Sequence, residues 1–221
     1  MLRPALACLL LSLSSAAIAA APGPVCQPFG ALGCFYAPPA AEGTRTPLLI
    51  YLRGWLNGQG QVPPESCLAS ARQAFAVYQI EKAAAAARSA VLVTCSSHLG
   101  VTPSDVVALE KEAGRGFSGT ILAAHSGGYV GLGKTLASGV TPQRIIMLDN
   151  FYLNKDLSKK IQAVVYGGAA CAGFYTKHNT DGYEKNFKPF VQCAVDYHED
   201  YGHEGGVAKC LPSYLKQTTC P

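Results

Sequence analysis

Short apolar runs that alternate with helix-like stretches constrain this chain more than any other feature of its sequence. The runs contain few polar residues, which is typical of strands that are buried on both faces. We expect strands at 47–54, 90–95, 119–125, 144–149, 160–167 and 190–197, and helices at 67–89, 104–114 and 206–216. This alternation predicts an α/β fold, in which a mostly parallel sheet is covered by helices on both faces. Ligands of such sheets bind beyond the carboxyl ends of the strands, so functional residues are sought there.

The ends of the second expected helix carry recognisable signals. Ser104 is the expected cap at its beginning, and Gly114 is expected to end it. Pro212 is expected either to begin or to kink the last helix, because proline lacks the amide hydrogen that a helix interior uses.

The first residues and the cysteines indicate an exported protein. Arg3 precedes an apolar run that ends in small residues, the layout of a secretory signal peptide at 1–20. The run is shorter than the ~20 apolar residues that a bilayer span needs, so no membrane span is expected. Of nine cysteines, removal of the signal takes Cys8 and leaves an even set: Cys26, Cys34, Cys67, Cys95, Cys171, Cys193, Cys210 and Cys220. No C-x-x-C pair occurs, so structural disulfides are predicted, in a secreted or periplasmic protein.

The mature chain has the length of one domain. Prolines make residues 21–46 an expected irregular N-terminal segment, and residues 47–221 are expected to form a single domain. The formal net charge is +4 and is spread along the chain, whereas nucleic-acid binding requires clustered basic residues. We therefore expect no nucleic-acid partner. We also expect a monomer that needs no cofactor.

Two overlapping motifs predict incompatible activities. Ala124 to Gly128 resembles the G-x-S-x-G turn that carries a catalytic serine, with alanine at the first glycine position. Gly128 to Thr135 fits G-x-x-x-x-G-K-T, the phosphate-binding loop of nucleotide hydrolases, and residues 145–149 imitate their magnesium-binding strand. Exported, disulfide-bonded proteins rarely meet ATP, which favours the serine turn, with a helix that begins just after Ser126. A nucleotide-binding protein that uses Gly128 to Thr135 remains the alternative.

The order of the candidate catalytic residues resembles that of the α/β-hydrolase superfamily, in which a nucleophile turn follows a buried strand and the acid and histidine come later. Ser126, Asp149 and His203 keep this order. The resemblance implies a minimal α/β-hydrolase-like domain, and its small size leaves no room for a large lid. It places the histidine in the loop before the last helix, which favours His203 over the alternative His198. Asp149 ends a strand and is preferred for that reason, although Asp181 matches the position that the superfamily uses more often.

The residues around Ser126 have further expected roles. Backbone N–H groups of Gly127 and of either Gly54 or Trp55 would form the oxyanion hole. Trp55 is the only tryptophan, and beside an active site it would line an acyl- or ring-binding pocket. Arg53 is expected to form a structural ion pair, with binding of a substrate carboxylate as the alternative.

Residues 198–204 include side chains of metal-ligand type. His198 and His203 are five residues apart and therefore miss the i, i+4 spacing of H-E-x-x-H. No metal is expected.

These residues together predict an exported serine hydrolase that cleaves an ester through an acyl-enzyme. Its substrate is expected to be a small-molecule or polymeric ester. An amidase or peptidase would use the same triad, and a non-catalytic binding protein is the other alternative.

Overall fold

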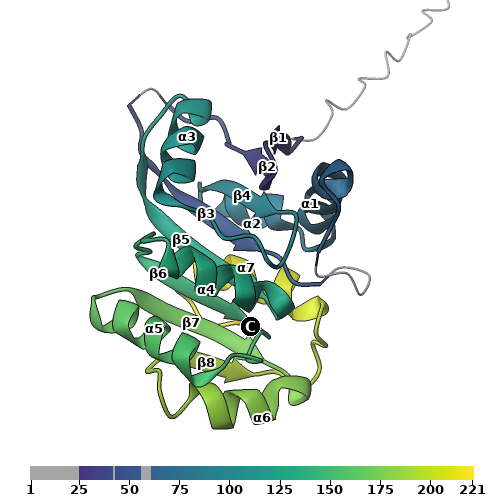
Figure 1. Ribbon diagram of the computed structural model, residues 1–221, viewed down its shortest axis with the longest axis vertical. Helices are drawn as coiled ribbons and strands as arrows, with labels where there is room; N and C mark the ends of the chain where they lie inside the picture. The colour runs from purple at the N-terminus through teal and green to yellow at the C-terminus, as the bar shows by residue number, and fades with distance from the viewer. Residues whose placement is uncertain (1–24, 42, 56–60) are drawn as a thin grey trace, which may run out of the picture.

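The computed structural model describes residues 25–41, 43–55 and 61–221 (Figure 1), so the expected signal peptide lies outside the described residues. The strands are β1 (Gln27–Phe29), β2 (Gly33–Tyr36), β3 (Thr46–Leu52), β4 (Ala90–Thr94), β5 (Phe117–His125), β6 (Arg144–Leu148), β7 (Ala170–Tyr175) and β8 (Ala194–Tyr197). The helices are α1 (Cys67–Val77), α2 (Ile80–Ala86), α3 (Pro103–Ala113), α4 (Tyr129–Ala137), α5 (Lys155–Tyr166), α6 (Thr180–Gly182) and α7 (Gly205–Leu215). Short 3-10 or π-helical turns lie at Pro64–Ser66, Ser126–Gly128, Lys177–Asn179 and Tyr183–Phe187.

These strands form one sheet with the order β1-β2-β4-β3-β5-β6-β7-β8. The strands from β4 to β8 in that order are parallel to one another. β1 and β2 form an antiparallel hairpin at one edge, and β2 also pairs with β4 in the antiparallel sense. The prediction of an α/β fold with a mostly parallel sheet is therefore confirmed.

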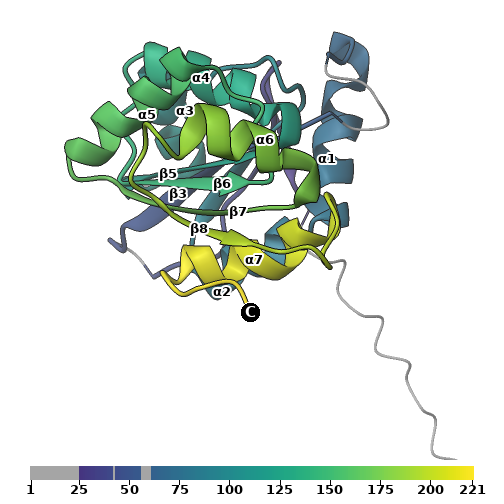
Figure 2. The ribbon, with the colours of Figure 1, turned by 90° about the horizontal axis from the view of Figure 1, so that it is seen from below.

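Helices cover both faces of the sheet (Figure 2), with α3, α4 and α5 on one side and α2 and α7 on the other. Side chains of a strand alternate between the two layers because successive Cβ atoms point to opposite faces. In β3, Leu49 and Tyr51 belong to the core under α7, whereas Leu48, Ile50 and Leu52 belong to the core under α4. All five are completely buried, and burial of a leucine or isoleucine contributes about 1.5–3 kcal/mol.

The N-terminal segment is more ordered than predicted. Residues 21–46, expected to be irregular, contain both strands of the edge hairpin, β1 and β2. Cys34 and Phe35 of β2 are buried, and a disulfide joins Cys26 to Cys34. Prolines on either side of the hairpin, and Pro28 within β1 itself, concealed it, because proline is a turn signal and within sheets is confined to edge strands such as β1.

Residues 160–167 were predicted as a strand, and this prediction is wrong. Residues 160–166 belong to α5, and Gly167 caps it. In this helix Leu157 and Ile161 are buried four residues apart while Lys159 and Lys160 are exposed. This spacing is the helical one, and the side chain of Asn154 caps the helix by accepting a hydrogen bond from the amide of Leu157. The apolar run 163–166 at its end suggested a buried strand, but it forms the last turn of the helix, where Ala163 and Tyr166 are exposed.

The strand of this region is β7, which the sequence did not reveal. Its residues, ACAGFY, begin with small side chains that have weak strand propensity. β7 forms because it pairs with β6 on one side and β8 on the other. Tertiary pairing therefore overrides a weak local preference.

Two other boundaries differ from prediction. The helix expected at 67–89 is two helices, α1 and α2, because Gln79 between them has a φ of +50° and cannot continue a right-handed helix. The strand expected at 190–197 is shorter, since only Ala194–Tyr197 pair with β7.

The caps of α3 are partly as expected. Thr102, not Ser104, is the N-cap: its side chain accepts a hydrogen bond from the amide of Asp105, whose carboxylate accepts one from the Thr102 amide. Gly114 ends the helix in a left-handed conformation, φ +63°, as predicted. Pro212 lies inside α7 and does not begin it.

Four disulfides connect the eight cysteines after residue 24: Cys26–Cys34, Cys67–Cys95, Cys171–Cys193 and Cys210–Cys220. The prediction of a disulfide-stabilised chain is confirmed. Within the described residues, none of the helices has the length and apolar character that a bilayer crossing would require.

Candidate active site

β5 ends in a sharp turn that carries Ser126. The strand ends at His125, a 3-10 turn follows at Ser126–Gly128, and α4 begins at Tyr129. Ser126 has a φ of +50°, a left-handed conformation that few non-glycine residues adopt and that costs about 1–3 kcal/mol. This is the strand, turn and helix arrangement that the sequence predicted around Ser126.

Two glycines allow other segments to approach this turn closely. A Cβ on Gly54, just beyond β3, would lie 2.5 Å from the Cβ of Ser126. A Cβ on Gly128 would lie 2.1 Å from the carbonyl oxygen of Leu52. Atoms do not approach this closely without displacement, so only glycine fits at either position. The end of β3 and the Ser126 turn are therefore in direct backbone contact.

Asp149 lies at the neighbouring strand end. In the parallel pairing of β5 and β6, His125 is opposite Leu148, so Ser126 and Asp149 leave adjacent strands at the same edge of the sheet. Asp149 also has a left-handed φ, +46°. The two candidate residues thus occupy equivalent, strained positions on adjacent strands.

The carboxylate of Asp149 is fully buried and accepts four hydrogen bonds. Oδ1 accepts from the amide of Thr176 (2.8 Å) and from Nδ2 of Asn179 (2.8 Å). Oδ2 accepts from the hydroxyl of Thr176 (2.9 Å) and pairs with Nδ1 of His203 (2.6 Å). Burial alone would raise the pKa of Asp149, but the hydrogen bonds from His203 and Thr176 outweigh it and hold the pKa below its usual value. The group is therefore a carboxylate.

His203 presents its two ring nitrogens to different surroundings. Nδ1 faces the Asp149 carboxylate, and the side chain is 27% exposed whereas that of Asp149 is 0% exposed. Because a carboxylate only accepts hydrogen bonds, Nδ1 carries the proton of this pair. In a neutral ring, Nε2 is then unprotonated and available as a base.

The side chain of His125 contacts the backbone of His203. Its Nε2 lies 3.2 Å from the carbonyl oxygen of His203, and the two rings are 4.8 Å apart between centroids. His125 is completely buried, and this burial, together with neighbouring His203, lowers its pKa to about 3. A neutral imidazole carries one ring proton, and because a carbonyl oxygen only accepts hydrogen bonds, this proton is on Nε2. Nδ1 is then unprotonated, and it is buried without a hydrogen-bond partner among the described residues. His203 thereby lies beside residue 125, the residue that precedes the candidate nucleophile.

A second contact fixes the residue after His203. The hydroxyl of Tyr78, at the end of α1, donates a short hydrogen bond to the carboxylate of Glu204, and its ring lies edge-on to His125 at 5.0 Å. The loop from β8 to α7 is thus attached at two successive residues. Within the described part of the chain, Ser126 and His203 do not form a hydrogen bond with each other.

Ser126 opens into a cleft of about 380 Å³. Apolar and aromatic side chains form most of its lining, which consists of Trp55, His98, Ser126, Gly127, Tyr129, Val130 and Tyr152. The indole of Trp55 packs on the turn itself, because a Cβ on Gly127 would lie 2.5 Å from its Cδ1 atom. The cleft therefore begins at the candidate nucleophile, and His203 is outside the lining.

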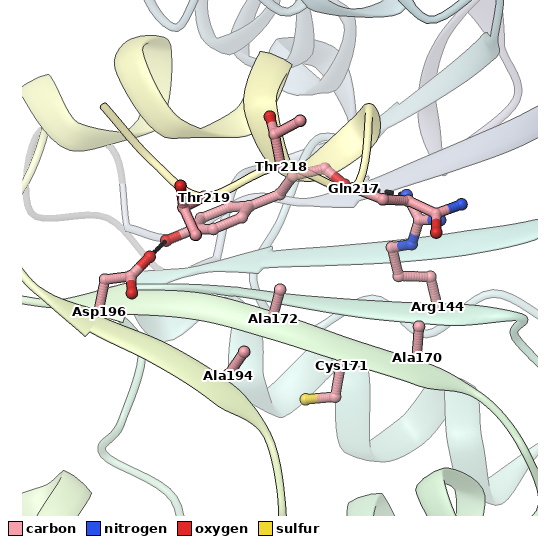
Figure 3. Close-up of a pocket in the computed structure, with 10 residues that line it drawn as sticks. Arg144, Ala170, Cys171, Ala172, Ala194, Asp196, Gln217, Thr218 and Thr219 are labelled. Atoms are coloured by element: carbon pink, nitrogen blue, oxygen red, sulfur yellow. Dashed lines mark hydrogen bonds between the residues drawn. The ribbon is translucent and has the colours of Figure 1, made fainter.

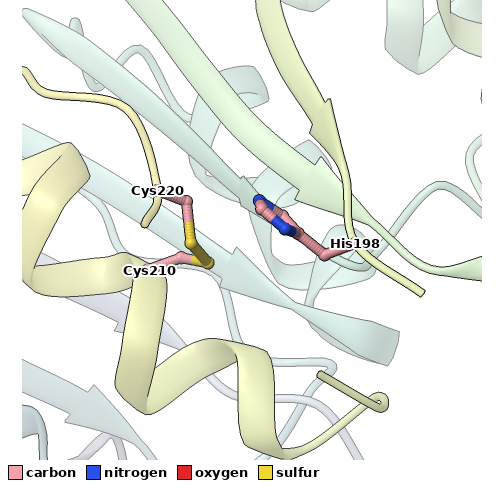
Figure 4. Close-up of side chains that lie close together, drawn as sticks. All are labelled: His198, Cys210 and Cys220. Carbon is pink, nitrogen blue, oxygen red and sulfur yellow. A yellow bond between two sulfur atoms is a disulfide. The ribbon is translucent and has the colours of Figure 1, made fainter. Parts of the chain in front are cut away.

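The alternative histidine, His198, lies in different surroundings. Its ring stacks on Tyr201 at 4.4 Å and faces Phe174 edge-on at 6.2 Å. Figure 4 shows it beside the Cys210–Cys220 disulfide. The structure therefore brings His203, and not His198, to Asp149.

The alternative acid, Asp181, is on the surface. Its side chain is 87% exposed and pairs with Lys185 at 2.9 Å, one helical turn further along. It is one partner of an ordinary i, i+4 ion pair. The structure brings Asp149 to His203 and leaves Asp181 apart.

Two groups of described residues have three metal-ligand atoms within 4.8 Å: His198 with Cys210 and Cys220, and His125 with His203 and Glu204. In the first group the disulfide occupies both sulfur atoms, so no thiolate is available. In the second, Asp149 engages Nδ1 of His203 and Tyr78 engages Glu204. In the first group both sulfur atoms, and in the second group Nδ1 of His203 and the Glu204 carboxylate, are therefore used in internal contacts.

The residues of the phosphate-loop motif are mostly helical. Those after Gly128 form α4, so the segment is not a loop that surrounds an anion. Nζ of Lys134 donates to the carbonyl of His98 at 2.8 Å. The hydroxyl of Thr135 is buried and accepts a hydrogen bond from the amide of Val101. These contacts tie α4 to the segment before α3.

Arg53 does not form the ion pair that was expected. It is only 1% exposed, and in the described residues its guanidinium donates to the carbonyl oxygens of Cys95 and Gly54. Burial lowers its pKa from the usual value. Arg53 thus fixes the backbone of Gly54, which precedes Trp55 at the turn.

Another hollow, of about 230 Å³, lies near the amino ends of β6, β7 and β8 (Figure 3). Its charged residues are engaged in internal contacts. Arg144 donates to the carbonyls of Tyr214 and Leu215, and Asp196 accepts a hydrogen bond from the Tyr214 hydroxyl. The hollow is the seam where the end of α7 meets the sheet.

No family model, curated protein or solved structure matches this chain. The interpretation of the site therefore rests on its own geometry.

Sequence reasoning missed several residues that form the site. Thr176 and Asn179, which hold Asp149, follow β7, and they were not considered because β7 itself was not predicted. Tyr129 and Tyr152 also line the cleft. Tyr129 occupies only a variable position of the phosphate-loop motif, and Tyr152 belongs to none of the motifs. The rule that ligands bind beyond the strand ends would have found Thr176 if β7 had been located.

Proposed function

We propose that this protein is an exported serine hydrolase of the α/β-hydrolase type, which cleaves an ester through an acyl-enzyme. Ser126 is the nucleophile, His203 the general base and Asp149 the acid that orients His203. The observation that carries the proposal is the Asp149–His203 pair, 2.6 Å apart, in which the carboxylate is fully buried and held by four hydrogen bonds. A carboxylate in such a position fixes the tautomer of the imidazole and stabilises the imidazolium that forms during catalysis.

The position of each residue along the chain supports the resemblance to the superfamily. Ser126 follows β5, Asp149 follows β6, and His203 lies between β8 and α7. A nucleophile turn after a buried strand, a later acid and a histidine before the last helix are what the resemblance implies. The paired cysteines agree with export, because disulfides persist in oxidising compartments.

The proposed reaction begins when Nε2 of His203 removes the proton of Ser126 and the serine oxygen attacks the ester carbonyl. The new C–O bond forms as the carbonyl π electrons move to oxygen, and backbone N–H groups of Gly127 and of Gly54 or Trp55 would receive this oxyanion. One such donor contributes about 2.7–4 kcal/mol to transition-state stabilisation. The carbonyl then re-forms as the bond between its carbon and the alcohol oxygen breaks, and His203 gives its proton to the leaving alcohol. Water, deprotonated by His203, attacks the acyl-enzyme in the same way, and the bond to the Ser126 oxygen breaks as that oxygen regains its proton. The reaction requires His203 to approach Ser126, and such contacts commonly tighten only when substrate is bound.

Covalent labelling with a fluorophosphonate probe tests the nucleophile. We expect the wild type to be labelled and Ser126→Ala not to be. Ser104→Ala removes an exposed serine from α3 and should be labelled like the wild type. Absence of labelling in the wild type between pH 6 and 9 would refute the proposed function.

Ester hydrolysis by substituted proteins tests the acid and the base. We expect Asp149→Asn to lower kcat by roughly 10³–10⁴-fold, whereas Asp181→Asn leaves it within about twofold. His203→Asn should be equally damaging, while His198→Asn and His98→Asn should not. His98 is included because it lines the same cleft as Ser126. A large loss in His98→Asn with normal rates in His203→Asn would assign the base to the cleft instead.

Matched ester and amide substrates distinguish an esterase from an amidase or peptidase. The two activities share the same machinery, so both should disappear in Ser126→Ala. We expect the ester to be preferred.

A further inference from the structure

We propose that the cleft beside Ser126 binds the acyl part of the substrate, and that this acyl group is a neutral, flat aromatic ring system. The inference rests on the proposed function and adds a substrate class to it.

Aromatic side chains form the walls of the cleft and remain accessible. Trp55 is 54% exposed and Tyr152 is 44% exposed, although large aromatic side chains are usually buried to a greater extent. The rings of Tyr129 and Tyr152 are 6.4 Å apart between centroids and tilted by 41°. Rings at such distances and angles attract further rings in offset or edge-on arrangements. The cleft thus presents ring faces and edges to whatever enters it.

Trp55 is held in place by the turn that carries the nucleophile. Its Cδ1 and Nε1 atoms lie where a Cβ on Gly127 would be, at 2.5 and 2.7 Å, so the five-membered part of the indole covers Gly127. Arg53 holds the preceding residue through the carbonyl of Gly54. Trp55 therefore forms a fixed wall of the cleft beside Ser126.

Few ionisable side chains line the cleft, and His98 is the basic one among them. None of its described lining residues is Asp, Glu, Lys or Arg. The groove between α4 and α5, which shares Tyr129 and Val130 with the cleft, is where Lys134, Asp156 and Lys160 occur. An acyl group with a carboxylate would lose its hydration in the cleft and would meet no lysine or arginine of the described lining. The nearby ammonium of Lys134 is engaged with the carbonyl of His98, so a neutral acyl group is favoured.

The position of His203 decides which half of the ester occupies the cleft. The leaving alcohol must receive its proton from His203. His203 pairs with Asp149 and is not among the lining residues of the cleft, whereas Ser126 and Gly127 are. The alcohol therefore leaves on the His203 side, and the acyl group, which stays bonded to Ser126, lies in the cleft.

The size of the cleft agrees with a ring system. A cavity of roughly 150 Å³ holds benzene. The volume of about 380 Å³ therefore accommodates two fused or linked rings.

Hydrolysis of p-nitrophenyl esters tests the inference with a constant leaving group. The acyl groups are benzoyl, 2-naphthoyl, acetyl and hexanoyl, and the measured quantity is the ratio of kcat/KM for aryl to alkyl esters. Comparison of this ratio between proteins cancels the intrinsic reactivity of each ester. We expect Trp55→Leu and Tyr152→Leu each to lower the ratio at least tenfold. Tyr166→Leu removes an aromatic side chain that is 74% exposed and outside the cleft lining, and it should leave the ratio within twofold.

A charged ring provides a second comparison. We expect p-nitrophenyl 4-carboxybenzoate to have a kcat/KM at least tenfold below that of the benzoate. Equal values for the two esters, or an unchanged ratio in both cleft variants, would overturn the inference. If Ser126 is still labelled by the fluorophosphonate in those cases, the hydrolase proposal stands and only the substrate class fails.

Binding without turnover makes the inference testable even if the protein is not a hydrolase. Trp55 is the only tryptophan of the chain, so tryptophan fluorescence reports on the cleft alone. In Ser126→Ala we expect a saturable fluorescence change with methyl benzoate, at least tenfold weaker affinity for methyl hexanoate, and weaker binding of methyl benzoate after Tyr152→Leu. Absence of a saturable change with methyl benzoate would overturn the inference. Saturable binding in a protein that no fluorophosphonate labels would support ring binding while refuting the hydrolase.

Discussion

At the scale of single residues, the site contains residues with a strained backbone or a fully buried ionisable side chain. Ser126 and Asp149 both have left-handed backbone conformations at adjacent strand ends. His125 is a histidine with no solvent contact that remains neutral and supports the backbone of His203. Strain and desolvation of this kind tend to occur where a structure positions functional groups.

His125 makes the stability of the folded protein depend on pH. Its pKa is lowered from 6.5 to about 3 in the folded state, mainly by burial. Between these values the unfolded chain binds a proton that the folded protein does not, so the free energy of unfolding falls as the pH falls. We expect His125 to leave the free energy of unfolding unaffected by pH above pH 6.5. Below pH 6.5 this free energy should fall by about 1.4 kcal/mol per pH unit because of His125.

Denaturant unfolding of His125→Gln between pH 7.5 and 4.5 measures this effect. Glutamine retains an N–H donor for the His203 carbonyl but does not titrate, so its stability should vary less with pH than that of the wild type. His178→Gln, at an exposed position, should follow the wild-type curve. Parallel curves for His125→Gln and the wild type would show that residue 125 is not the titrating group.

At the scale of elements, the site is formed where β3, β5 and β6 end beside the start of α4. The contact between β3 and the turn at Ser126 depends on the absence of side chains at Gly54 and Gly128. Asp149 is held by Thr176, the residue after β7. Each catalytic candidate therefore comes from a different connection, and the sheet sets their relative positions.

Substitution of glycine by alanine at two nearby positions should have opposite effects. In Gly128→Ala the new Cβ would lie 2.1 Å from the carbonyl oxygen of Leu52, and because backbone must move we expect a loss of about 1–3 kcal/mol in unfolding free energy. Fluorophosphonate labelling of Ser126 should also become slower. In Gly133→Ala, inside α4, the nearest atom is a side-chain carbon of Leu157 at 3.4 Å.

Gly133→Ala should therefore gain up to about 1 kcal/mol, because alanine has the higher helix propensity. Denaturant unfolding of both variants provides the comparison. Equal stabilities for the two variants would mean that the turn can relax without cost.

At the scale of the whole molecule, four disulfides connect elements around a two-sided core. Cys67–Cys95 joins the start of α1 to the segment after β4, and Cys171–Cys193 joins β7 to the segment before β8. Cys26–Cys34 closes only the edge hairpin. The bonds thus constrain segments on either side of the central strands.

The disulfides should differ in their contribution to stability according to the loops that they close. Cys67–Cys95 spans 28 residues and Cys26–Cys34 spans 8. By the chain-entropy estimate, replacement of both cysteines by alanine costs about 3.6 kcal/mol for the longer loop and about 2.5 kcal/mol for the shorter. Denaturant unfolding of the two double variants measures the difference. A larger loss for the Cys26–Cys34 variant would show that edge-hairpin contacts, not loop length, dominate.

The sequence by itself determined the fold class and the chemistry that the chain offers. Continuous apolar runs such as 47–54 and 144–149 are recognisable because burial on both faces leaves no room for polar residues. The even number of cysteines predicted disulfides, and the glycines after Ser126 marked the sharp turn. These features are local, and local composition is sufficient to indicate them.

Only the tertiary structure decided which residues meet. β7 has little strand propensity of its own and exists because two neighbours pair with it, so Thr176 and Asn179 could not be located in advance. From the sequence, both Asp149 and Asp181 were candidates for the acid, and both His203 and His198 were candidates for the base. The order of strands in the sheet brings Oδ2 of Asp149 and Nδ1 of His203 to 2.6 Å. Contacts between residues 54 positions apart depend on how strands are arranged, which no local pattern encodes.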